Sequence, residues 1–138
     1  MGNEETMRLV RDVLEAQEAA IQKACAIPTE KLGMQVPLGQ REVPLRALLY
    51  MLVNHPREHS TEIKKVLAET KGPRASEAQN IVAQARESMG NLVGNFTALD
   101  DKDLDRQFEE GRSIRVILQH LARSHQNYLR AIEKALEG

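Results

Sequence analysis

Apolar residues recur along this chain at intervals of three and four, and the strict alternation typical of a surface strand is absent. The pattern predicts four helices. Their ends are indicated by Asn3 and Ser76, which are good N-caps, and by Pro28 and Gly72-Pro73, which cannot continue a helix. The expected helices span residues 3–26, 44–70, 76–96 and 113–136. Two of the three connections between them are long, and the expected fold class is all-α, a four-helix bundle.

The two halves of the chain resemble each other at a constant offset in residue number. VPLRALLYMLVNHPREHSTEIKKVL aligns with RSIRVILQHLARSHQNYLRAIEKAL, so that Leu45 falls on Ile114 and Arg46 on Arg115. Such self-similarity is typical of a duplicated helix pair and predicts a bundle with pseudo-two-fold symmetry. Two amphipathic helices could also reach this likeness by convergence.

Size and charge limit the classes of protein. A chain of 138 residues is long enough for one domain, expected to cover residues 1–138. The 19 basic and 20 acidic residues nearly balance, and the chain has no Trp, two Phe and two Tyr. This composition argues against nucleic acid or an anionic membrane as partner. One cysteine, Cys25, fits a reducing compartment, and no apolar run suits a signal peptide or a membrane span. A cytoplasmic protein is expected.

The stretch HPREHSTEI contains the most distinctive candidate chemistry. His55 and His59 are four residues apart, so on a helix they share one face and can reach one metal ion. Pro56 lies between them and removes a backbone donor. It predicts either a kink at this point or a helix that restarts with Asn54 as its cap.

A helix pair joined by a loop such as LDDKDLDR, and followed by a helix that begins GRSIRVILQHLARSH, resembles the DinB-like bundles over essentially the whole chain. The resemblance implies a divalent metal held by three histidines, one from the second helix and a His-x-x-x-His pair from the fourth. It also implies a thiol transferase or isomerase that uses a low-molecular-weight thiol, although many members of the family have no known activity. Homodimers are implied as well.

In this chain the two histidine motifs are exchanged between the helices. HPREHSTEI on the second predicted helix resembles the family's paired motif, which points to His55 and His59. SIRVILQH on the fourth resembles the single-histidine motif, which points to His120. At the family's single-histidine position on the second helix this chain has Met51. At the family's paired positions on the fourth helix it has Ser124 and Tyr128.

Helical geometry makes this exchange compatible with a working site. On a helical wheel His55 and His59 lie on the flank of the apolar stripe of their helix, and His120 occupies a comparable flanking position on its own helix. In a bundle with two-fold symmetry, exchanging the second and fourth helices leaves the same three histidine positions around the site. Three imidazoles leave a coordination position open, as catalytic sites do, and do not choose among zinc, nickel and iron.

Other candidate residues have a functional and a structural interpretation. His125 lies squarely on the apolar stripe of its helix and is expected to be a hydrogen-bonded core or interface residue, or an alternative ligand. Glu58 and Glu62 flank the histidine pair and could orient a ring, accept a proton from bound water, or be solvated charges. Cys25 is expected to be a buried small apolar residue.

Two functions follow from these residues. In the first, the chain is an enzyme whose metal activates water or a thiol, for hydrolysis or thiol transfer to a small-molecule substrate. In the second, it is a non-catalytic binding or structural bundle with a vestigial metal site. The apolar residues Val116 and Leu129, which lie off the predicted core stripes, add to the expectation of a homodimer.

Overall fold

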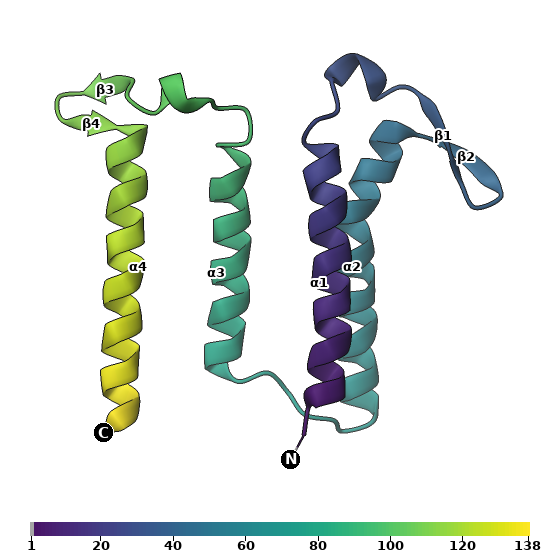
Figure 1. Cartoon of the computed structure of the whole chain (residues 1–138). Helices are drawn as coiled ribbons and strands as arrows, with labels where there is room; N and C mark the ends of the chain where they lie inside the picture. The colour runs from purple at the N-terminus through teal and green to yellow at the C-terminus, as the bar shows by residue number, and fades with distance from the viewer. Residues whose placement is uncertain (1) are drawn as a thin grey trace. The chain divides into compact units, whose positions relative to one another are not determined.

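The computed structural model describes residues 2–138, which divide into two compact units, the first ending at Ile81 and the second spanning Val82–Gly138. The first unit holds α1 (Glu4–Ala24), the 3-10 turn η1 (Thr29–Lys31), strands β1 (Gln35–Leu38) and β2 (Arg41–Pro44), and α2 (Leu45–Glu69) (Figure 1). Helix α3 (Glu77–Gly94) begins in the first unit and continues in the second. The second unit then holds η2 (Asp101–Asp103), β3 (Gln107–Glu109), β4 (Arg112–Ser113) and α4 (Ile114–Glu137).

The structure confirms a mostly helical chain with four helices, each within two residues of its predicted ends. Ser76 caps α3 as expected: its Oγ accepts from the backbone N of Gln79 at 3.1 Å, and the Gln79 side chain accepts from the backbone N of Ser76 at 2.9 Å. This reciprocal arrangement satisfies two amide groups at the helix start. Asn3 is the N-cap of α1, but its side chain forms no capping hydrogen bond.

Each unit contains a short antiparallel hairpin directly before its second helix, where the sequence predicts a loop. In the first unit Val36 pairs with Val43, and Leu38 pairs with Arg41 across a two-residue turn. Gly39, the first turn residue, has a φ of 63°, a conformation that favours glycine. The expectation that strands are absent is wrong here, because strands of two to four residues are too short to show an alternating pattern.

A backbone hydrogen bond fixes the start of the second helix in each unit. The Arg46 amide donates to the Leu32 carbonyl at 2.8 Å, and the Arg115 amide donates to the Leu104 carbonyl at 2.9 Å. In the second unit the Arg115 guanidinium also forms two hydrogen bonds to the Asp105 carboxylate, at 2.7 and 3.1 Å. The backbone bonds satisfy amide groups that the first helical turn leaves free.

Helix α2 continues through Pro56 as one helix from Leu45 to Glu69. The predicted alternative of a restart with Asn54 as cap is therefore wrong. Pro56 has no amide hydrogen, so the Leu52 carbonyl lacks its partner four residues on.

The apolar stripes of the helices remain largely exposed in the described residues. Val13 on α1 is 67% exposed and Ile63 on α2 is 59% exposed. Within residues 2–138 the most buried side chains are Val43 and Ser113, next to the two helix starts, and they remain 9% and 6% exposed. Cys25, the C-cap residue of α1, is exposed, contrary to expectation, because the apolar stripe that it continues, which includes Leu14, is itself exposed.

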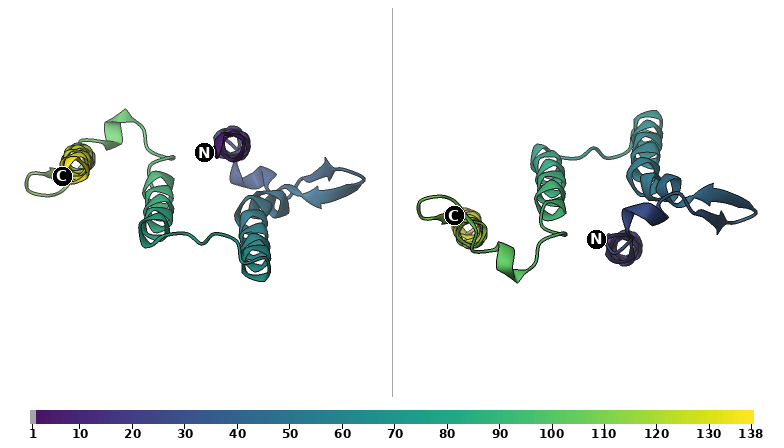
Figure 2. Two further views of the ribbon diagram at one scale, coloured as in Figure 1. Left: turned by 90° about the horizontal axis from the view of Figure 1, so that it is seen from below. Right: turned by 90° about the horizontal axis from the view of Figure 1, so that it is seen from above.

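Within each unit the two long helices are antiparallel, with the 3-10 turn and hairpin at the end where they connect (Figures 1 and 2). None of the helices among residues 2–138 is both long enough and apolar enough to cross a membrane.

Candidate metal centre

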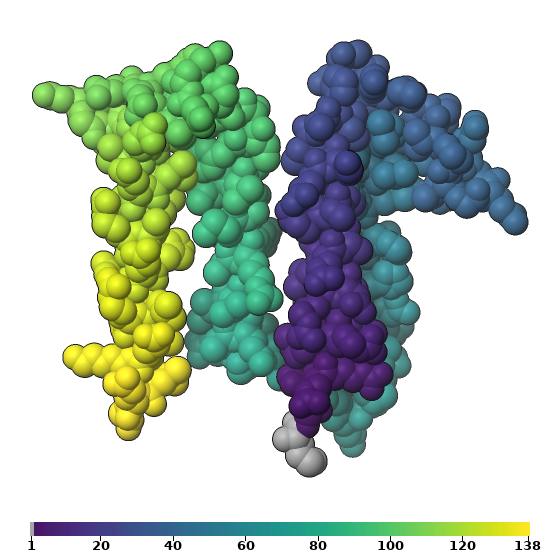
Figure 3. Space-filling view, in the orientation of Figure 1, coloured from purple at the N-terminus to yellow at the C-terminus, as the bar shows by residue number. Residues whose placement is uncertain are grey.

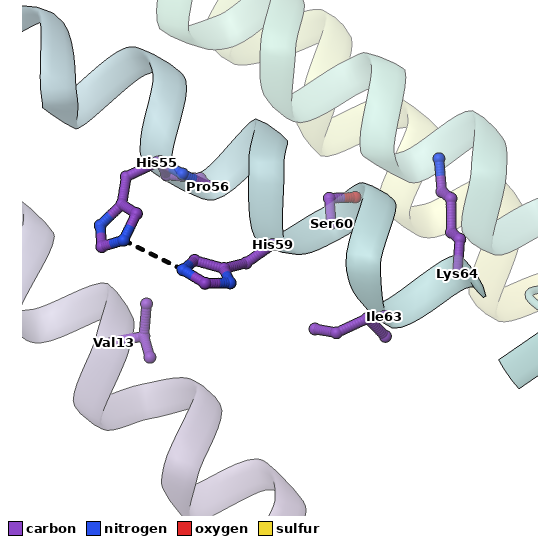
Figure 4. A pocket seen from close by; sticks show the side chains of 7 residues that line it. All are labelled: Val13, His55, Pro56, His59, Ser60, Ile63 and Lys64. Carbon is purple, nitrogen blue, oxygen red and sulfur yellow. Dashed lines mark hydrogen bonds between the residues drawn. The ribbon is translucent and has the colours of Figure 1, made fainter. Parts of the chain in front are cut away.

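His55 and His59 face each other on α2. Their Nε2 atoms are 3.0 Å apart, and their ring centroids are separated by 4.6 Å with an interplanar angle of 59° (Figure 4). The spacing of four residues places both rings on one side of the helix, one turn apart. The sequence-predicted pair is therefore brought together, with the Nε2 atoms of the two rings directed at each other.

Glu62 lies against the outer nitrogen of His59 and favours one tautomer of this ring. Its Oε2 lies 2.6 Å from His59 Nδ1, so the ring donates from Nδ1 to the carboxylate. In the neutral ring, His59 Nε2 then carries a lone pair directed at His55. His55 completes the chain by donating from its own Nε2. In metal sites the ring nitrogen that does not bind the ion commonly donates a hydrogen bond to a carboxylate.

The spacing of the two nitrogens fits a shared ion. Ligand nitrogens about 2.0–2.1 Å from one ion are roughly 2.9 Å apart at a right angle and roughly 3.4 Å apart at a tetrahedral angle. The observed 3.0 Å between the Nε2 atoms lies in this range. To bind an ion together, both rings must present a lone pair, so His55 would move its proton to Nδ1, whereas His59 already has the required tautomer.

A cavity of about 650 Å³ borders the pair on the side of α1. Val13 of α1 points toward the two rings from across the cavity (Figure 4). The rest of the lining comes from α2: Pro56, Ser60, Ile63 and Lys64. The lining is mainly apolar, but the cavity is open: the His59 and Glu62 side chains are 57% and 66% exposed.

A second cavity, of about 490 Å³, is also lined by His55 and lies between α2 and the β1–β2 hairpin. The hollow beneath the hairpin is seen beside α2 in Figure 3. Its lining includes Glu58, one of the two carboxylates flagged by sequence. Met51 and Asn54 of α2 also line it, together with Leu38 and Arg41 of the hairpin, which sequence reasoning missed because the hairpin was not predicted.

The remaining candidates lie elsewhere. His120 is an exposed residue of α4 in the second unit, and neither unit gathers three potential His, Cys, Asp or Glu ligands among residues 2–138. The three-histidine set therefore stays a prediction. His125 has the predicted hydrogen bond, between Nδ1 and the Leu121 carbonyl at 2.8 Å, and an edge contact with Tyr128, but it is exposed rather than in a core.

No model of a protein family, no curated protein and no solved structure matches the chain.

Proposed function

We propose that the chain is a cytoplasmic, divalent-metal-dependent enzyme of the DinB-like class that activates water or a low-molecular-weight thiol. His55, His59 and His120 would hold the ion, which would be zinc, nickel or iron. The observation that supports this proposal most directly is the 3.0 Å approach of His55 Nε2 to His59 Nε2, with Glu62 on the far nitrogen of His59.

The proposal includes a four-helix bundle with a pseudo-two-fold internal repeat. The constant offset between the two halves and the common order of elements in each unit, a helix, a 3-10 turn, a hairpin and a second helix, support it. In such a bundle α2 and α4 would be neighbours, and His120 would face the pair on α2. The exposed apolar stripes on the helices are the surfaces that such a bundle would bury.

The chain's own groups have defined tasks in this site. Glu62 would keep His59 in the tautomer that presents Nε2, and the exposure of the His59 side chain (57%) would leave the open coordination position accessible to water or a thiol. When bound, a divalent ion supplies Lewis acidity, which lowers the pKa of a water or thiol ligand. Glu58 lines the cavity on the other side of His55, where it can accept a proton from a reacting molecule.

The proposal is tested by metal analysis of protein purified without a polyhistidine tag. The parent protein should bind zinc, nickel or iron near one equivalent, and both His55→Ala and His120→Ala should abolish tight binding. His125→Ala is the matched control, because this ring is bonded to the Leu121 carbonyl, and it should leave binding unchanged.

Binding should also weaken below neutral pH, since only the unprotonated imidazole nitrogen binds metal. Failure of all three metals to bind more tightly than the micromolar range would contradict the proposal. It would favour the non-catalytic bundle with a vestigial site.

A further inference from the structure

The cavity between α2 and the β1–β2 hairpin is built from two regular surfaces. On α2 its lining residues are Met51, Asn54, His55 and Glu58, which follow the i, i+3, i+4, i+7 spacing of a single helix face. On the hairpin, Leu38 and Arg41 are directly opposed across the two strands. Opposed residues place their side chains on the same face of a hairpin, so both reach the cavity together.

This cavity is lined by one positively and one negatively charged side chain, which do not form an ion pair with each other. Arg41 comes from the hairpin and Glu58 from α2, and neither forms an ion pair within the described part of the first unit. A simple anion would meet the Glu58 carboxylate, and a simple cation would meet the Arg41 guanidinium. A ligand that carries both a carboxylate and an ammonium group satisfies both side chains.

The other lining groups suit the uncharged part of such a ligand. Leu38 and Met51 offer apolar contact, and the Asn54 amide offers both a donor and an acceptor. His55 lines this cavity as well as the cavity on the α1 side. A molecule bound under the hairpin would therefore lie against a ring of the proposed metal centre.

We propose that this cavity binds a small zwitterion of the amino-acid type, with its carboxylate on Arg41 and its ammonium group on Glu58. Asn54 adds a hydrogen bond, and the side chain of the ligand extends toward His55. The binding of the zwitterion is independent of the proposed function. Its role as the substrate rests on that function.

Three small thiols with the same two-carbon framework test the charge requirement. L-cysteine carries both charged groups, cysteamine lacks the carboxylate, and 3-mercaptopropionate lacks the ammonium group. Their affinities for the metal-free full-length protein are measured by NMR titration at pH 7. L-cysteine should bind about ten-fold more tightly than either of the others, because each of them leaves one charged side chain without a partner.

Variants assign the two ends of the ligand. Arg41→Gln should reduce the affinity for L-cysteine about ten-fold and leave cysteamine unaffected, and Glu58→Gln should reduce it while leaving 3-mercaptopropionate unaffected. Arg112→Gln is the matched control, because Arg112 is a hairpin arginine of the second unit that lies over the Phe108 ring. It should change none of the three affinities.

Equal affinity for the three thiols in the parent protein would overturn the inference, whether or not any variant folds. So would an Arg41→Gln protein that binds L-cysteine as the parent does. Because these titrations use metal-free protein, their failure is separate from failure of the metal analysis, which alone tests the proposed function.

Discussion

At the residue scale, the candidate site depends on a short chain of hydrogen bonds along α2. The sequence predicts the pairing of His55 with His59, since their spacing alone puts both rings on one face. It leaves open which flanking carboxylate orients a ring. The structure distinguishes them: Glu62 is 2.6 Å from His59 Nδ1, whereas Glu58 faces the hairpin-side cavity. Which glutamate contacts His59 depends on the side-chain rotamers, and the spacing of residues along a helix does not specify rotamers.

Replacing Glu62 should weaken metal binding without removing a ligand. In Glu62→Gln the charge that fixes the His59 tautomer is lost, and the affinity for zinc should fall about ten-fold or more. The measurement is competition with a chromophoric chelator at neutral pH. Glu69→Gln, at the last residue of α2, is the control and should retain the parent affinity. An unchanged affinity in Glu62→Gln would show that this carboxylate does not support the site.

At the element scale, the four helices could be predicted because caps, prolines and apolar periodicity agree at each end. The two hairpins could not be predicted, although a glycine in each connection marks the turn. Gly39 and Gly111 have φ values of 63° and 72°. A single glycine in a polar loop is compatible with many conformations, so this signal is weak without a longer strand pattern.

Gly39→Ala should destabilise the first hairpin. Alanine at a positive φ costs about 1 kcal/mol, and no atom crowds the added methyl group, so the effect isolates the backbone conformation. The measurement is the free energy of unfolding in urea. Gly33→Ala, which also has open space around its Cβ but no positive φ, is the control. If both variants lose the same stability, the turn conformation is not the cause.

The contact between Asp105 and Arg115 should make a small, pH-dependent contribution to stability. The two hydrogen bonds from Arg115, together with its positive charge, lower the pKa of Asp105, although partial desolvation opposes them. A lowered carboxyl pKa stabilises the fold above the ordinary value of about 3.9, and this is lost as pH falls through the lowered pKa. The contribution is small because the pair is exposed.

Thermal unfolding of the parent and of Asp105→Asn tests this linkage. The parent should have the higher melting temperature at pH 7, and the difference should shrink below about pH 4 as the carboxylate is protonated. A difference that stays constant from pH 7 to pH 2 would contradict the ionic origin of the effect.

At the scale of the whole molecule, sequence reasoning reached the number of helices but not how their apolar faces are covered. A helical wheel shows which face of one helix is apolar, but it does not identify the partner of that face. The same limit applies to the metal site: the pair on α2 is a local feature, whereas the participation of His120 depends on the packing of the proposed bundle.

The protein should form a homodimer at micromolar concentration. Val116 and Leu129, which the sequence places off the predicted core stripes, are 43% and 56% exposed and would be available for such a contact. Analytical ultracentrifugation should give twice the chain mass of 15.5 kDa, and Leu129→Glu should shift the protein to the monomer. A parent protein that sediments only as a 15.5 kDa monomer would exclude the dimer.

The measurement that tests the central claim most directly is X-ray absorption at the zinc edge of the protein loaded with one equivalent of zinc. The account predicts three imidazole nitrogens at about 2.0–2.1 Å, falling to two in His120→Ala and unchanged in His125→Ala. A first shell with two imidazoles or fewer in the parent, or a spectrum that His120→Ala leaves unaltered, would contradict it.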